Sequence, residues 1–256
     1  MEINPKLDEI AALALDLGRL LMESGARGRA VEEQIIRLAR GLGASQVEVR
    51  LGYASLAITV GREGGAITRM HKVGPHGVNQ RLDIALRLLA SRVGRGESTA
   101  AGTRAELDRL VRETPRHPLW LVSVAVGLAC MAFGRLLGVD WPGAAPVFCA
   151  ATLGQWLRRQ LAHRKFNPFF GAATVACVSS FLAGLAARRL GSGTVDSAMI
   201  AAVLLLVPGV PALNAQSDII EGRPTLGSAR TVGVAMTLIF ATAGVWLGRA
   251  LLGEGR

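Results

Sequence analysis

Cysteine and tyrosine are scarce in this sequence, which has three cysteines and one tyrosine in 256 residues. Cys130, Cys149 and Cys177 lie in apolar runs, and none has a CxxC spacing or a pair of histidines nearby. This pattern indicates neither a disulfide framework nor a metal site, so we expect three small apolar packing residues. The N-terminus lacks a basic segment ahead of an apolar one, so no cleavable signal is expected.

The net charge is +10, but the basic residues are not distributed as in a nucleic-acid-binding protein. Acidic residues are mixed with the basic ones in the first half, and aromatic residues are not interleaved with them. Basic clusters beside membrane spans are expected in any case, because cytoplasmic loops are enriched in Lys and Arg. We therefore expect the chain to associate with a lipid bilayer and not to bind nucleic acid.

Catalytic and cofactor motifs are also missing. The sequence contains no GxSxG, HExxH or Walker pattern. The glycines at 61–65 join two predicted strands, whereas a phosphate-binding loop opens a helix. His71 and His76 have no metal-ligand spacing with an acid or thiol. We therefore expect that the protein is not an enzyme and binds no cofactor. Glu32 has the position of a residue that orients a helix pair.

Charge is distributed unevenly along the chain. Residues 1–117 carry 18 Lys and Arg against 14 Asp and Glu, whereas residues 118–256 carry 11 against 5. In the second part the charges form short clusters between apolar runs. The sequence therefore predicts a cytoplasmic α+β domain over 1–117 and an all-α membrane domain over 118–256.

The first part changes its hydrophobic period twice. Helical spacing over 7–23 ends at Ser24-Gly25, and a second helix covers 31–42. Alternating residues then predict three strands in an antiparallel meander, at about 47–51, 56–60 and 67–73. Two more helices are predicted, one over 77–94 and one capped by Ser98 and ending at Glu113.

Five apolar runs follow, at about 118–137, 142–161, 168–187, 194–212 and 229–251. Each is close to the length of about 20 residues that a membrane helix needs. Trp120, Trp141, Trp156 and Trp246 lie near run ends, as interfacial anchors do. With the N-terminus in the cytoplasm, eight Lys and Arg fall on the cytoplasmic side and five outside. An odd number of spans suggests that a partner completes the bundle.

The fourth run is interrupted by Pro208, Gly209 and Pro211. Prolines break the helical hydrogen-bond ladder, and the freed carbonyls are tolerated at membrane depth only beside protein or a water-filled cavity. Asn214 and Asp218 follow, four residues apart and so on one face of a resumed helix. Broken helices beside polar groups often form a transporter's substrate site.

Two interpretations of this segment stay open at this point. In the first, it lines a pathway for a substrate or an ion, and Arg230 neutralises a substrate carboxylate or pairs with Asp218. In the second, 212–228 is a cytoplasmic loop with Asp218 and Glu221 in solvent, a turn at Gly222, and Arg230 as an ordinary cytoplasmic anchor.

The order of these features resembles the bacterial threonine/serine exporter family. Ser24-Gly25-Ala26 leads to Val31-Glu32, the strands end in Arg69 to Val73, and five spans follow. The fourth ends in Val207-Pro208-Gly209, before Asn214, Asp218, Gly222 and Arg230. The chain is similar to the larger subunit of the split form of this family.

The resemblance implies a secondary transporter of the cytoplasmic (inner) membrane that exports threonine and serine, or dicarboxylates such as succinate. It also implies a smaller multi-span partner subunit. The candidate pathway residues are Pro208, Gly209, Pro211, Asn214, Asp218, Gly222 and Arg230. The alternatives are a membrane-anchored regulatory or scaffolding protein and a membrane-tethered hydrolase, for which the sequence shows no nucleophile paired with a base.

Overall fold

A computed structural model describes residues 5–62, 65–114 and 117–253. The chain forms two compact units. The first unit contains the residues up to 115 together with 209–232, and the second contains 116–208 together with the residues from 233 onward. The grouping of 209–232 with the N-terminal part of the chain is not indicated by the sequence.

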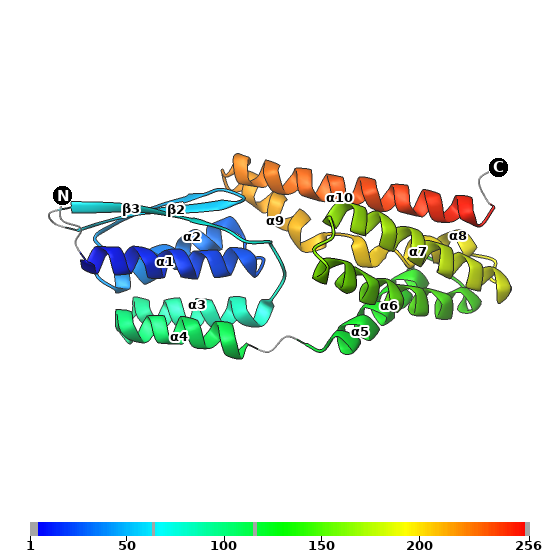
Figure 1. Ribbon diagram of the computed structural model, residues 1–256, viewed down its shortest axis with the longest axis horizontal. Helices are drawn as coiled ribbons and strands as arrows, with labels where there is room; N and C mark the ends of the chain where they lie inside the picture. Colours follow the sequence, from blue (N-terminus) through cyan, green and yellow to red (C-terminus); the bar gives the residue numbers. More distant parts are fainter. Residues whose placement is uncertain (1–4, 63–64, 115–116, 254–256) are drawn as a thin grey trace. The chain divides into compact units, whose positions relative to one another are not determined.

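The first unit is a mixed helix and sheet fold (Figure 1). Its elements are α1 (Pro5–Glu23), α2 (Gly28–Gly41), β1 (Gln46–Leu51), β2 (Ser55–Arg62), β3 (Gly65–Lys72), α3 (Gln80–Gly94), α4 (Ala100–Glu113), α9 (Gly209–Ile220) and the start of α10 (Pro224–Leu251). The strands pair antiparallel in the order β1-β2-β3, which confirms the predicted meander. Helix α1 packs against β2 and β3 and also against α3 and α4.

The core of this unit follows the two hydrophobic periods of its sequence. On β2, Leu56, Ile58 and Val60 are buried, whereas the alternating residues are half-buried. Helix α1 is buried on most of its surface because other elements cover several of its sides. Each Leu or Ile side chain removed from water in this way contributes about 1.5–3 kcal/mol.

Two details of the predicted elements differ in the structure. The cap of α4 is Thr99, whose hydroxyl accepts from the Gly102 amide at 3.2 Å, and the prediction of Ser98 was wrong. Both are good capping residues, but a cap directly precedes the first helical residue and accepts from an amide two or three positions later, and α4 begins at Ala100. Helix α3 begins at Gln80 behind Asn79, so residues 77–79 lie outside it. Glu63 and Gly64 of the predicted hairpin turn lie outside the described residues.

The second unit is helical. It contains α5 (Leu119–Leu136), α6 (Trp141–His163), α7 (Pro168–Arg189), α8 (Val195–Ala201), the 3-10 turn η1 (Leu204–Leu206) and the rest of α10. Helix α6 packs against α5 and α7. A Cβ atom on Gly127 of α5 would lie 2.8 Å from the Phe148 carbonyl oxygen of α6. The small residue therefore permits the close approach of these two helices.

Three helices in the described residues are long and apolar enough to span a membrane, namely α5, α7 and α10. A fourth candidate is the pair formed by α8 to η1 and α9, which is bent at its break. Helix α6 has 23 residues and covers the predicted run at 142–161, but it is not among these candidates. It carries Gln155, Arg158 and Arg159, which lower its hydropathy. Three or four spans therefore meet these criteria, one or two fewer than the five that the sequence predicts.

Candidate functional site

The two motifs that carry the family resemblance meet within the first unit. Asn214 and Asp218 lie on the buried face of α9, with exposed fractions of 8% and 0%. Arg230 of α10 is 5% exposed. We call these three side chains the polar cluster. They contact the loop between α1 and α2, about 190 residues earlier in the chain.

Asp218 is the centre of the polar cluster. Its Oδ2 atom accepts from Nη1 of Arg230 at 2.5 Å, and its Oδ1 atom accepts from the Gly28 amide at 2.9 Å. Gly28 is the first residue of α2, and the preceding Arg27 provides no side-chain cap. A carboxylate at a helix N-terminus is stabilised by free amide groups and by the helix dipole. Asp218 therefore caps α2 from a distant part of the chain.

The remaining donors of the polar cluster are directed at backbone carbonyls of the same loop. Nδ2 of Asn214 donates to the Gly25 carbonyl at 2.8 Å, and Nη2 of Arg230 donates to the Ala26 carbonyl at 3.3 Å. The loop is held in this shape by Gly25, whose φ of +91° favours glycine. The buried charges are thus paired, as buried charges need to be.

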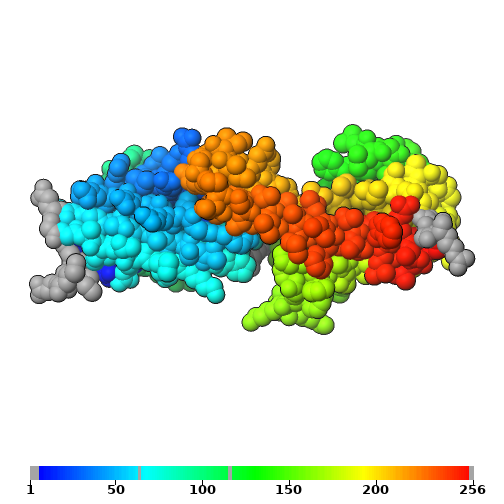
Figure 2. All heavy atoms as spheres, turned by 90° about the horizontal axis from the view of Figure 1, so that it is seen from above, coloured from blue at the N-terminus to red at the C-terminus, as the bar shows by residue number. Residues whose placement is uncertain are grey.

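Close packing accompanies these hydrogen bonds. A Cβ atom on Gly28 would lie 2.8 Å from Oδ1 of Asp218 and 3.0 Å from Cδ2 of Leu226, so no larger residue fits without a shift. Leu226 of α10 is buried and belongs to the hydrophobic core of the first unit. Figure 2 shows the orange atoms of α9 and early α10 against the blue atoms of α2.

A second ion pair lies beside the polar cluster. Nη2 of Arg223 lies 2.5 Å from Oε2 of Glu32, and both residues are half-buried. Arg223 also lies 3.4 Å from Glu221. Glu32 therefore links α2 to the turn before α10, whereas the sequence predicts that it orients a helix pair. Gly222 has a φ of +81° in that turn.

The helix break lies at Val207 and Pro208, between η1 and α9. Pro208 has no amide hydrogen, so it cannot donate to the Leu205 carbonyl in a 3-10 pattern. Nη1 of Arg158, on α6, donates to this carbonyl at 3.1 Å. From its place in the sequence, Arg158 is only one of the eight Lys and Arg residues expected on the cytoplasmic side, and this count of charges does not indicate the contact. Its position inside a predicted span was the available signal, because ionisable groups there usually have a specific partner.

The structure brings together three of the seven candidate residues, Asn214, Asp218 and Arg230. Pro208 lies in the break, Gly209 is the first residue of α9, and Pro211 lies in the first turn of α9, where proline is tolerated. The alternative of a solvated loop at 212–228 is wrong for the residues of α9 and for Asp218, which is buried, whereas its turn at Gly222 is observed. Of the roles considered for Arg230, the pair with Asp218 is observed.

The histidines of the first unit have structural contacts. The His76 ring lies 2.8 Å from the Tyr53 carbonyl and 3.2 Å from the Met22 carbonyl, and it stacks on the Tyr53 ring. His71 lies 4.0 Å from Asp16. Within residues 5–62, 65–114 and 117–253, no three His, Cys, Asp or Glu side chains are arranged to hold a metal ion.

Comparison with known proteins connects this arrangement to a family. A family model described as "Putative threonine/serine exporter" matches residues 12–252. A Klebsiella aerogenes protein named "Probable succinate transporter subunit YjjP" is 30% identical over 95% of this chain and 94% of its own length. An Escherichia coli K12 protein of the same name is 28% identical over 95% of each chain. No solved structure matches the chain.

The family match covers nearly the whole chain, including both motifs that form the polar cluster and the proline break that precedes Asn214 in the sequence. The chain therefore belongs to the threonine/serine exporter family.

Proposed function

We propose that this chain is the larger subunit of a secondary transporter that exports small hydrophilic metabolites. The observation that carries the proposal is a buried, charged cluster that joins the helix after a proline break to α10, in a chain of an exporter family. The relatives are named as subunits of a succinate transporter, which favours a dicarboxylate, and the family name favours threonine or serine. A smaller multi-span subunit would complete the complex.

The proposed location is the inner membrane of a bacterium, with the N-terminal α+β domain in the cytoplasm. Residues 118–256 would cross the membrane five times, with α6 as an additional span beside α5, α7, the broken run at 194–212 and the part of α10 from 229 onward, while most of α9 and the start of α10 pack in the first unit. Arg158 supports this assignment of α6, because its guanidinium has a carbonyl partner on a neighbouring helix. Because the family is one of transporters, the proposed function assigns no catalytic role to the N-terminal domain.

The polar cluster offers a specific mode of substrate recognition. Arg230 and the α2 amide at Gly28 together bind one carboxylate, that of Asp218. A substrate carboxylate has the same chemistry and would compete with Asp218 for these donors. Asp218, once displaced, would accept a proton or a substrate ammonium, and Asn214 would bind a polar head group. Pro208, Gly209, Pro211 and Gly222, at the two ends of α9, would permit its movement.

Counterflow into proteoliposomes tests this mechanism. The chain and its partner subunit are reconstituted, and uptake of labelled succinate, threonine and serine is compared with that of empty vesicles. We expect Asp218→Asn to abolish flux while the protein still inserts into the membrane. Unchanged flux in this variant would remove Asp218 from the mechanism.

A double variant separates transport from packing. Asp218→Asn together with Arg230→Gln removes both buried charges, so it avoids the unpaired charge of a single substitution. We expect this variant to be better folded than Asp218→Asn but equally inactive. Recovery of flux in the double variant would show that the charges serve only to hold α9 and the start of α10 against α2 within the first unit.

The complete internal pairing of the polar cluster favours one second candidate, a membrane-anchored regulatory or scaffolding protein. In that case Asp218 and Arg230 would be purely structural, because the polar contacts described for them are all to the same unit. The same experiment decides between the two functions. Flux above that of empty vesicles, dependent on this chain, excludes a pure anchor.

A further inference from the structure

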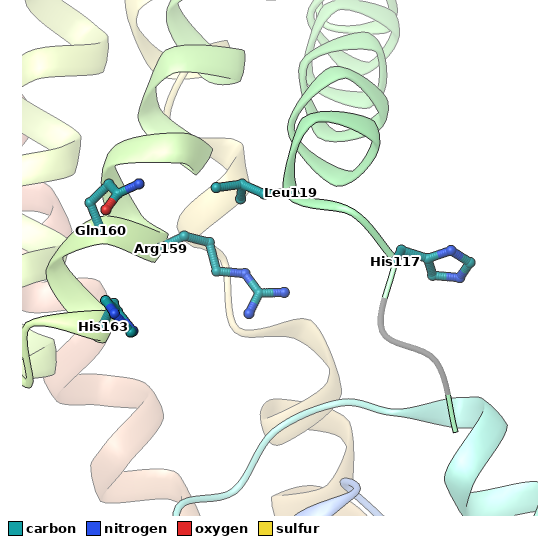
Figure 3. A pocket seen from close by; sticks show the side chains of 5 residues that line it. All are labelled: His117, Leu119, Arg159, Gln160 and His163. Atoms are coloured by element: carbon teal, nitrogen blue, oxygen red, sulfur yellow. The ribbon is translucent and has the colours of Figure 1, made fainter. Parts of the chain in front are cut away.

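A basic cleft lies in the second unit, at the C-terminal end of α6. It has a volume of about 510 Å³ and is lined by His117, Leu119, Arg159, Gln160 and His163. Figure 3 shows Arg159, Gln160 and His163 on α6, with the Arg159 guanidinium in the space between α6 and the segment that carries His117 and Leu119. Arg159 and His163 are four residues apart and therefore share one face of the helix.

The basic side chains of this cleft lack protein partners. In the part of the chain that the structure describes, neither the Arg159 nor the His163 side chain has a hydrogen bond or an ion pair. The described carboxylates of the second unit are Asp140 and Asp196. Asp140 is the cap at the opposite end of α6, about 30 Å away by helix rise, and Asp196 pairs with Arg249.

The basic residues at the C-terminal end of α6 have one ordinary explanation, which accounts for only some of them. Basic residues are favoured in the last turn of a helix by the helix dipole and in cytoplasmic loops of membrane proteins. Arg164 and Lys165 fit that explanation and do not line the cleft. It does not explain why Arg159 and His163 face a hollow whose other wall comes from α5.

Two exposed tryptophans place the cleft at the level of a membrane surface. Trp120 follows Leu119 on α5 and is 68% exposed, and Trp156 precedes Gln160 by one turn on α6 and is 50% exposed. Indole rings in such positions gather at the headgroup region of a bilayer. A cationic cleft between two helices at that depth has the chemistry to bind an anionic headgroup.

We propose that this cleft binds the phosphate group of an anionic phospholipid. The planar guanidinium of Arg159 donates two parallel hydrogen bonds to the phosphate oxygens, which is the geometry that Arg and phosphate favour. His163 and the Gln160 amide add donors from the next turn of α6. Trp120 and Trp156 lie beside the glycerol and upper acyl region. The site is separate from the polar cluster and does not depend on the proposed transport function.

Native mass spectrometry of the purified full-length chain tests the site. The protein is released from detergent after titration with phosphatidylglycerol or phosphatidylcholine, and the affinity of the first bound lipid is compared. We expect preferential binding of phosphatidylglycerol. Arg159→Gln should weaken it about fivefold, as expected for one cation near an anionic surface, and Arg159→Gln with His163→Gln should weaken it further. Phosphatidylcholine binding should not change.

The matched control is Arg164→Gln, which removes a cation from the same helix end without altering the cleft lining. We expect this variant to bind phosphatidylglycerol as the unmodified chain does. Equal losses in Arg164→Gln and Arg159→Gln, or no preference for phosphatidylglycerol, would overturn the site. Arg159 and His163 are both exposed, so equal melting temperatures of all variants are expected and are checked in parallel.

A third set of titrations distinguishes a lipid from a soluble anion. Inorganic phosphate and succinate are added to the complex with phosphatidylglycerol. Retention of the lipid at millimolar concentrations of both anions supports a headgroup site. Displacement by either anion would assign the cleft to a soluble ligand and overturn the lipid assignment, whether or not the chain transports.

Discussion

The buried pair of Asp218 and Arg230 makes a quantitative prediction about stability. Oδ2 of Asp218 and Nη1 of Arg230 lie 2.5 Å apart, and their side chains are 0% and 4% exposed. Removing one partner leaves the other charge buried and unpaired. We therefore expect Asp218→Asn or Arg230→Gln alone to lower the free energy of unfolding by about 3–5 kcal/mol. Asp218→Ala should cost about 1 kcal/mol more than Asp218→Asn, because alanine cannot cap α2 at Gly28.

The double variant completes the cycle. With both charges replaced, no unpaired charge remains in the pair, and the asparagine side chain of Asp218→Asn still offers an oxygen to the Gly28 amide. We expect the double variant to be more stable than the sum of the single effects predicts, by about 0.5–3 kcal/mol. Denaturant unfolding in detergent, followed by circular dichroism, measures all four proteins. Strictly additive single effects would refute the reasoning, since they would show that the two side chains do not interact.

Three further predictions concern positions at which the structure makes one contact decisive. Gly28→Ala should lower the free energy of unfolding by about 1–3 kcal/mol, because its Cβ would displace Asp218. Gly209→Ala is the control, since open space surrounds this position, and it should leave the free energy of unfolding unchanged. Equal effects of the two substitutions in denaturant unfolding would contradict this prediction. Arg158→Met should cost about 1 kcal/mol because it leaves the Leu205 carbonyl without its donor, and Arg159→Met in lipid-free detergent is the control expected to match the unmodified chain. The hydroxyl of Ser192, with the amides of Gly193 and Gly143, holds the pKa of Asp140 below its usual range. The stability that Asp140 contributes is therefore present at neutral pH and lost as the pH falls through that lowered pKa, below about 4. Unfolding measured at pH 7 and pH 3 should show a smaller loss in Asp140→Asn, and an equal loss would refute the assignment.

Local sequence patterns were sufficient to predict most of the helices and strands. The meander followed from the alternation of Leu56, Ile58 and Val60 with less apolar residues, and the end of α1 followed from Ser24-Gly25. These features depend on neighbours within one or two turns. The choice between Ser98 and Thr99 failed because both side chains can cap, and only the position of the first bonded amide distinguishes them.

The polar cluster was only half predictable. The shared face of Asn214 and Asp218 follows from their spacing, and the pair with Arg230 was one of several alternatives. The contact with Gly28 joins residues 190 positions apart, for which a single sequence has no local signal. One indirect signal existed. Arg27 precedes α2 where Ser, Thr, Asp or Asn would be expected, so the helix lacked a cap of its own and needed one from elsewhere.

The contribution of Leu226 and Asp218 to the first unit has a consequence for biosynthesis. Synthesis proceeds from the N-terminus, and domains generally fold as they emerge from the ribosome. Here Asp218, which accepts from the Gly28 amide, and Leu226, which completes the core of the first unit, are translated only after α5, α6, α7 and α8. The N-terminal portion therefore lacks these two contacts while those helices are being synthesised, and a nascent chain arrested before Asp218 should be more sensitive to protease than the finished one.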